Sequence, residues 1–333
     1  MNLLVDVVIV NWNTGEHLHN CLRSIARADQ SVLRVGEVVV VDNASSDGSA
    51  RDLPATGLRL RTVHNPDNRG FATACNQGAA LCRSDFLLFL NPDTELYSDT
   101  LRITGEFLRT PAAQRFGIFG ARMVDAHGRP LISCSRFPSP RLCVGGMTGL
   151  DRLAPALFPP HHLRPEEVAR SGQVDQVIGA FFLVRRHLFT ELNGFDEGYF
   201  LYMEEVDFAL RARRLGRPSY HIAQARVFHA EAISSAQLGL GRHYLMLCSR
   251  TRYMLRHWPK RQAWLLIGLS LSVEPAARLL GAALRGQPVD VRSTLAVQWA
   301  FLRWLRHGRR PGPLAPSLLP APQVAEPETA RPA

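Results

Sequence analysis

The chain has 333 residues, of which 46% are hydrophobic and 20% charged, which is typical of one large folded domain with an appendage. This composition excludes a fibrous or wholly disordered protein. The formal net charge of +10 comes from residues 237–310, which hold 13 lysines and arginines against two acids. Residues 1–236 carry no net charge, so we expect no nucleic-acid partner.

Six cysteines, at positions 21, 75, 82, 134, 143 and 248, form no C-x-x-C pair and show no metal-ligand spacing. The opening residues MNLLVDVVIVNWN lack a basic region, and Asp6 interrupts their apolar run, so a signal peptide is not expected. We therefore expect a cytoplasmic protein with free, buried thiols.

Short apolar segments alternate with helical patterns through the first hundred residues. The predicted strands are Val5–Val10, Glu37–Val41, Leu58–Val63 and Phe86–Leu90. The predicted helices are Glu16–Ala28, Ser49–Leu53 and Ala72–Leu81. This alternation predicts an α/β fold with a doubly wound, mostly parallel sheet that binds ligands at the carboxyl ends of its strands.

Polar residues follow each of these strands. Asp42 ends the second strand, where it can accept hydrogen bonds from a nucleobase or ribose, or only cap the turn that follows. After the third strand, Asn68-Arg69-Gly70 leads into a helix whose amides can bind an anion. This loop lacks the ending of a P-loop.

The fourth strand ends abruptly in Asn91-Pro92-Asp93. A carboxylate at the edge of a buried strand suits a divalent cation that bridges a diphosphate, although an Asn-Pro-Asp turn without a ligand explains the same residues.

The segment YFLYMEEVDF sets acids against aromatic residues. A helix beginning at Glu204 and running to about Leu215 places Glu204 and Glu205 in its first turn, and Asp207 and Arg211 become an i,i+4 ion pair. These roles explain the charges without chemistry. The apolar residues in front favour a second interpretation, in which burial raises the pKa of a first-turn acid toward that of a general base.

Five segments in this order resemble the inverting glycosyltransferases of family 2, with the GT-A fold, and among them the rhamnosyltransferase-like branch. The segments are VVIVNWN, EVVVVDNASSDGS, NRGFATACNQG, FLLFLNPDTEL and GAFFLVRRHLFTELNGFDEGYFLYMEEVDFALRARRLGRPSYHIAQARVFH. The resemblance implies a nucleotide-diphospho-sugar donor and a hydroxyl acceptor on a glycan or lipid-linked glycan, with rhamnose from dTDP-rhamnose as the expected sugar.

The resemblance also implies a role for each site residue. Glu205 stands at the general-base position, with Glu204 to orient or support it; because many relatives have Asp where Glu205 stands, the resemblance leaves open which of the two glutamates is the base. Asp93 and His229 are implied ligands of Mn²⁺ or Mg²⁺. The residues implied to contact the donor nucleotide are Val10, Trp12, Asp42, Asn68, Arg69, Gly70 and Asn91.

The chain is expected to divide into a GT-A catalytic domain over residues 1–236, a basic helical segment over 237–310 and a disordered, Pro-rich tail over 311–333. The apolar stretch Ala263–Val273, which Glu274-Pro275 closes, is expected to be too short to span a bilayer. The basic segment either lies on an anionic membrane surface, at the inner face of the cytoplasmic membrane, or packs on the catalytic core.

Two further functions compete with the transferase. A catalytically degenerate binding or scaffold protein has the same fold but no turnover. A sugar-phosphate nucleotidyltransferase needs a Gly-rich, basic loop after the first strand, and Asn11-Trp12-Asn13 does not supply one.

Overall fold

The computed structural model describes residues 3–230, 237–287 and 290–308. The predicted tail over 311–333 lies outside these residues. The strands are β1 Leu3–Asn11, β2 Leu33–Asp42, β3 Leu60–His64, β4 Phe86–Leu90, β5 Thr94–Leu96, β6 Ile118–Val124, β7 Cys134–Ser135, β8 Gly172–Val174, β9 Gln176–Val177, β10 Phe181–Arg185 and β11 Ser219–His229. The helices are α1 Glu16–Arg27, α2 Phe71–Leu81, α3 Thr100–Leu108, α4 Pro140–Thr148, α5 Leu150–Leu153, α6 Arg186–Glu191, α7 Glu204–Arg214, α9 Leu240–His257, α10 Lys260–Leu284 and α11 Val291–His307, with 3₁₀ turns at Pro111–Arg115 and Pro165–Val168.

Nine strands form one large sheet in the order β3-β2-β1-β4-β10-β6-β11-β5, with β8 paired to β11. The four strands from β3 to β4 are parallel, which confirms the prediction for the N-terminal half. Beyond them β10 runs antiparallel to both β4 and β6, while β11 is parallel to β6. A separate two-stranded ribbon, β7–β9, lies outside this sheet.

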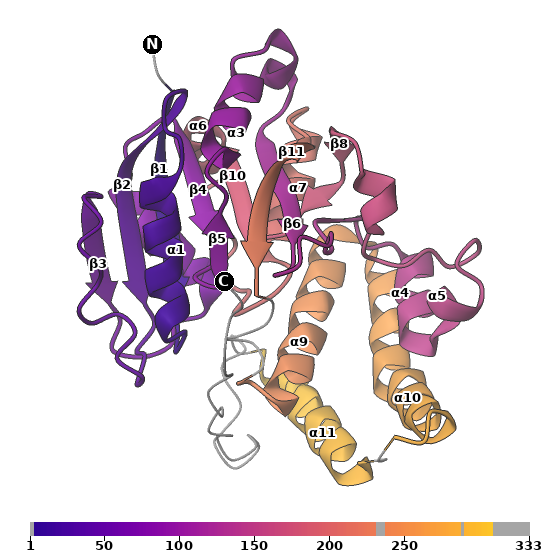
Figure 1. The fold of residues 1–333 in the computed structure, drawn as a ribbon. Helices are drawn as coiled ribbons and strands as arrows, with labels where there is room; N and C mark the ends of the chain where they lie inside the picture. Colours follow the sequence, from indigo (N-terminus) through magenta and orange to yellow (C-terminus); the bar gives the residue numbers. More distant parts are fainter. Residues whose placement is uncertain (1–2, 231–236, 288–289, 309–333) are drawn as a thin grey trace.

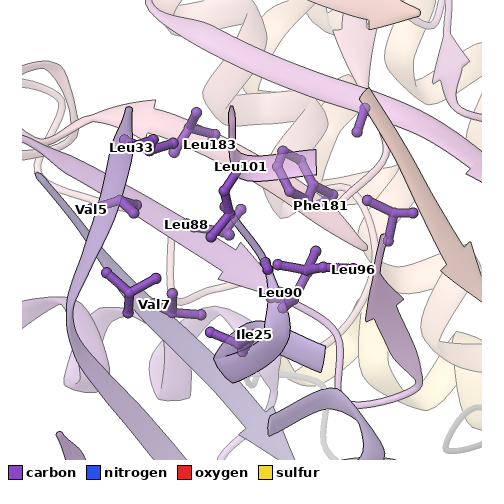
Figure 2. Packing of buried hydrophobic residues seen from close by; sticks show 14 of the residues in the cluster. Val5, Val7, Ile25, Leu33, Leu88, Leu90, Leu96, Leu101, Phe181 and Leu183 are labelled. Atoms are coloured by element: carbon purple, nitrogen blue, oxygen red, sulfur yellow. The ribbon is translucent and has the colours of Figure 1, made fainter. Parts of the chain in front are cut away.

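Both faces of the parallel strands are buried, which explains why their sequences are almost entirely apolar. Val5 and Val7 of β1, Leu88 of β4 and Phe181 of β10 lie in one core cluster with Ile25 of α1 (Figure 2). The intervening residues of the same strands face a second cluster that includes α2. The sheet therefore has helices on each side, and its polar strand ends are left for a site.

The predicted strands and the two longer predicted helices are confirmed within a few residues, whereas the helix predicted over Ser49–Leu53 is wrong. That segment forms bends and turns. Asp52 has a left-handed backbone with φ 48°, and Pro54 follows shortly after it. The side chain of Asp47 accepts hydrogen bonds from the amides of Gly15 and Ser49, so local bonds in the loop replace those of a helix.

The helices α9, α10 and α11 lie below the sheet, beside α4 and α5 (Figure 1). The apolar stretch that Glu274-Pro275 closes belongs to a longer helix, because α10 continues through Pro275 to Leu284 and has 25 residues in all. The carboxylate of Glu274 is buried and pairs with Arg250 of α9. This contact offsets the free energy lost with the backbone hydrogen bond that the proline removes. By length and composition, α10 is the one described helix that could cross a membrane, with a mean hydropathy of 1.4.

Candidate active site

A cavity of about 690 Å³ opens at the carboxyl ends of the parallel strands. The ends of β1 and β4, the loop before α2, the start of α7 and the end of β11 form one side of it. The helices α4 and α9 form the opposite side, so the cavity lies between the sheet and the C-terminal helices. Of the predicted site residues, nine line this cavity: Val10, Trp12, Asn68, Gly70, Asn91, Asp93, Glu204, Glu205 and His229.

Two predicted donor contacts, Asp42 and Arg69, do not line the cavity. Asp42 is buried, and its Oδ1 accepts hydrogen bonds from Asn11 Nδ2 at 2.9 Å and from Ser45 Oγ at 2.5 Å. The parallel register pairs Asn11 directly with Asp42, which brings these two strand ends together. Asp42 therefore braces the rim of the cavity, and its neighbour Asn43 contributes to the wall.

The loop before α2 is fixed to the loop before α7. Gly70 has φ 80°, and a Cβ at this position would lie 2.5 Å from the carbonyl oxygen of Phe200. The amide of Phe71 donates a hydrogen bond to that oxygen over 2.7 Å. Glycine is required here because the two backbones approach so closely, and the contact holds the start of α2 beside the two glutamates.

Asp93 and His229 meet because β11 pairs with β5, which places His229 opposite Thr94. The Nε2 atom of His229 lies 3.3 Å from Oδ1 of Asp93 and makes no hydrogen bond to the described residues. A carboxylate oxygen and an imidazole nitrogen are both suitable ligands for Mn²⁺, whereas Mg²⁺ prefers the carboxylate oxygen. Among the described residues no group of three His, Cys, Asp or Glu side chains gathers around a common point.

Glu204 and Glu205 begin α7 in a strained turn. Tyr202 and Met203, neither of them glycine, both have φ 70°. Two consecutive left-handed residues of this size cost free energy, and such strain gathers at functional sites. The turn directs the first residues of α7 into the cavity, where both glutamates contribute to the wall.

Burial raises the pKa of both carboxyl groups. For Glu204, which is 4% exposed, burial is the main cause and the charge of Glu205 adds to it. For Glu205, burial alone raises the pKa. The Oε2 atom of each side chain is buried and has no hydrogen-bond partner among the described residues. Backbone hydrogen bonds lower the pKa of each group, but burial outweighs them, and a carboxylate with a raised pKa is more basic, as a general base requires.

Asp207 connects α7 to α9. It pairs with Arg211 over 2.7 Å, as predicted, and its side chain is fully buried, whereas i,i+4 ion pairs of helices usually lie at the surface. Its other oxygen lies 2.7 Å from His257 Nε2 and 3.1 Å from Arg256 Nε, both on α9. Arg256 and its neighbour Arg252 also pair with Asp196 in the loop before α7. This set of ion pairs, which we call the α7–α9 clamp, holds the helix that carries the two glutamates.

Several cavity residues are absent from the sequence predictions. Ser135 of β7 and Gln176 of β9 are paired in register, and both are buried in the wall. Gln176 is 2% exposed, and its Oε1 has no hydrogen-bond partner among the described residues. Short strands of two residues carry no periodic signal, so only the tertiary pairing reveals this polar wall.

Comparison with known proteins agrees with this geometry. Residues 6–154 match the family described as Glycosyl transferase family 2. The chain is 29% identical to the N-acetylglucosaminyl-diphospho-decaprenol L-rhamnosyltransferase of Mycobacterium tuberculosis, over 71% of this chain and 79% of that protein. It is 27% identical to the rhamnosyltransferase WbbL of Escherichia coli K12, over 44% of this chain and 52% of that protein.

Solved structures establish the fold. A mannosyltransferase from Pyrobaculum calidifontis in complex with GDP-Man and Mn²⁺ superposes with a TM-score of 0.54 at 17% identity, over 93% of this chain and 88% of that one. TarS of S. aureus in complex with UDP-GlcNAc gives a TM-score of 0.52 at 16% identity, over 91% and 79% of the two chains. Residues 6–154 therefore form a glycosyltransferase domain of family 2, and the chain has the GT-A fold.

Proposed function

We propose that this glycosyltransferase of glycan synthesis moves L-rhamnose from a nucleoside-diphosphate donor, dTDP-rhamnose, to a hydroxyl group of a lipid-linked glycan. The observation that carries the proposal is one cavity that joins an Asp93–His229 pair to two buried glutamates. The names of the two rhamnosyltransferases similar to this chain support the sugar, and the decaprenol-linked substrate in one name supports the acceptor class.

The donor arm of the cavity has residues for each part of a nucleotide sugar. Val10 and Trp12 offer an apolar wall for the base, and the loop at Asn68 and Gly70 lies at the start of α2, whose amides favour an anion. Asp93 and His229 would hold Mn²⁺ or Mg²⁺. When bound, such a cation neutralises charge on the diphosphate.

Glu205 is proposed to remove the proton from the acceptor hydroxyl group. The hydroxyl oxygen then forms a bond to C1 of the sugar while the bond from C1 to the diphosphate oxygen breaks. The nucleoside diphosphate leaves with the bonding electrons, and attack from the opposite face inverts C1. Burial of Glu205 supports this role because it raises the pKa of the carboxyl group and keeps bulk water from competing as acceptor.

A thermal-shift panel tests the donor. The purified protein is heated with nucleoside diphosphates and nucleotide sugars, each with Mn²⁺, Mg²⁺ or a chelator. We expect dTDP and dTDP-rhamnose with Mn²⁺ to raise the melting temperature, because a ligand at 100 times its Kd stabilises the folded state by about 2.7 kcal/mol.

Two variants test the metal pair. His229→Ala should lose the metal-dependent part of the shift, whereas the exposed control His127→Ala should keep it. No shift with any nucleotide would overturn the proposal. Release of nucleoside diphosphate in the presence of a lipid-linked acceptor separates a working transferase from a degenerate scaffold that only binds.

We also propose that the C-terminal helices rest on an anionic membrane surface at the cytoplasmic side. Trp264 of α10 is 54% exposed and Trp299 of α11 is 59% exposed, and Leu295 lies one turn before Trp299 on the same face. Arginines with exposed side chains flank these positions, among them Arg261 and Arg292. Exposed tryptophans within a basic surface are typical of proteins that insert shallowly into anionic bilayers.

A further inference from the structure

The helix α9 and the turn before it also line the cavity. The residues that α9 and the turn before it contribute are spaced by four, so they form one stripe on one side of the helix. They are Leu238, Arg242, Met246 and Arg250. Because a helix rises 1.5 Å per residue, the stripe from Arg242 to Arg250 is about 12 Å long. The cavity therefore has a second, elongated arm.

The facing wall of this arm comes from α4. Leu142 and Cys143 are buried and apolar, and Gly146 follows one turn later on the same face of the helix. A Cβ built on Gly146 meets no atom within 4 Å, so open space lies next to this residue. An apolar channel thus runs between α4 and α9, beside the site that holds the glutamates.

Among the described residues of the arm, the two arginines differ in how their charges are compensated. Arg250 is neutralised by the buried carboxylate of Glu274, and it also donates to Ser270 Oγ over 3.0 Å. Arg242 is exposed and makes no hydrogen bond or ion pair with the described part of the chain. A ligand that matches these walls has a narrow apolar chain and an anionic group near Arg242.

We propose that this arm binds the isoprenoid-diphosphate part of the acceptor, with Arg242 against the diphosphate and the chain between α4 and α9. The proposal rests on the proposed function, since it assumes that a sugar attached to the diphosphate reaches Glu205. The chemistry of the arm supports it: a free glycan would leave the apolar walls of Leu142 and Met246 unused, and a neutral lipid would leave Arg242 unused. The helix α10 packs against α4 and α9, and α11 packs against α9. Their other sides expose apolar residues, which is consistent with an isoprenoid chain that continues into a bilayer.

Binding of farnesyl diphosphate tests the arm without knowledge of the acceptor sugar. Farnesyl diphosphate is titrated calorimetrically into the full chain. One titration is run without nucleotide, and a second is run after the donor site has been filled with the nucleoside diphosphate that gives the largest thermal shift. Gly146→Phe projects a ring into the open space, and Arg242→Gln removes the charge. The matched controls are Gly268→Phe, which also has no atom within 4 Å of a built Cβ, and Arg261→Gln; both positions lie on α10 outside the cavity.

We expect wild-type protein to bind farnesyl diphosphate, and each of the two arm variants to weaken this binding at least about tenfold. The controls should stay within about twofold of wild type, and nucleoside diphosphate should bind equally to all five proteins. If Gly146→Phe does not fold, judged by circular dichroism, the smaller Gly146→Leu replaces it.

Three results would overturn the proposal: no binding of farnesyl diphosphate by wild type, unchanged binding by the Gly146 variant, or an Arg242→Gln variant that loses nucleoside diphosphate instead. The last result would assign Arg242 to the donor. This proposal can fail while the proposed transferase function stands, because failure of the latter would appear as a wild-type protein that binds no nucleotide.

Discussion

Glu205→Gln is the substitution that tests the proposed mechanism most directly. Glutamine keeps the volume and the planar head group of glutamate but cannot accept the proton. A positioned general base contributes roughly 10²–10⁴ to rate, so we expect turnover to fall by that factor, about 3–5 kcal/mol of transition-state stabilisation.

Glu204→Gln is the matched control, since it removes a neighbouring carboxyl group from the same helical turn. Glu204 is proposed to support the base, so its variant should lose about tenfold at most. Neither variant should unfold the protein: burial raises the pKa of both groups, and the folded state therefore disfavours their charged forms. Both variants should resist denaturant at pH 7–8 at least as well as wild type.

Initial rates at saturating donor, followed as nucleoside diphosphate released, measure the effect on turnover, and a donor titration measures binding. We expect donor affinity to be unchanged in Glu205→Gln, because the base contacts the acceptor. Turnover within a few-fold of wild type in a folded Glu205→Gln protein would refute the assignment. A large loss in Glu204→Gln with a small loss in Glu205→Gln would exchange the two roles.

Three further outcomes are expected. First, turnover should fall as pH is lowered through the raised pKa of Glu205, at a pH above the ordinary glutamate value of 4.5; an acid limb at or below 4.5 would contradict the burial argument. Second, Asp207→Ala should lower the free energy of unfolding by about 3–5 kcal/mol in urea titrations, because it leaves partly buried cations unpaired, whereas a loss under 1 kcal/mol would mean that the clamp is not a stabilising unit. Third, Trp264→Ala combined with Trp299→Ala should reduce sedimentation with vesicles containing anionic lipid, and equal sedimentation of both proteins would contradict membrane contact through this surface.

The sheet and the strand-end side of the site were predictable from sequence because each depends on local signals. Apolar runs marked the parallel strands, and the residues directly after them, such as Asn91 and Asp93, had to lie at one edge of the sheet. The first-turn acids of α7 were predictable from the stop at Gly216 and the charge order along the helix.

The opposite side of the site was not predictable, because it depends on contacts between distant segments. Nothing near Gln176 or Gly146 in sequence indicates that they face the same cavity. Asp207 looked like a surface ion-pair residue because its other partners lie about 50 residues later on α9. The continuation of α10 through Pro275 was not predictable either, because helix propensity ignores the burial of Glu274 against α9.

The α7–α9 clamp limits how the chain could be rearranged by recombination or engineering. Asp207 is a buried acid of α7 and Asp196 a half-buried acid in the loop before it, and the basic side chains that pair with them, Arg252, Arg256 and His257, belong to α9, which lines the cavity. A chimaera that takes its sheet from this chain and its C-terminal helices from a relative would bury unmatched charge unless both partners change together. The helices α7 and α9 can thus be exchanged only as one unit.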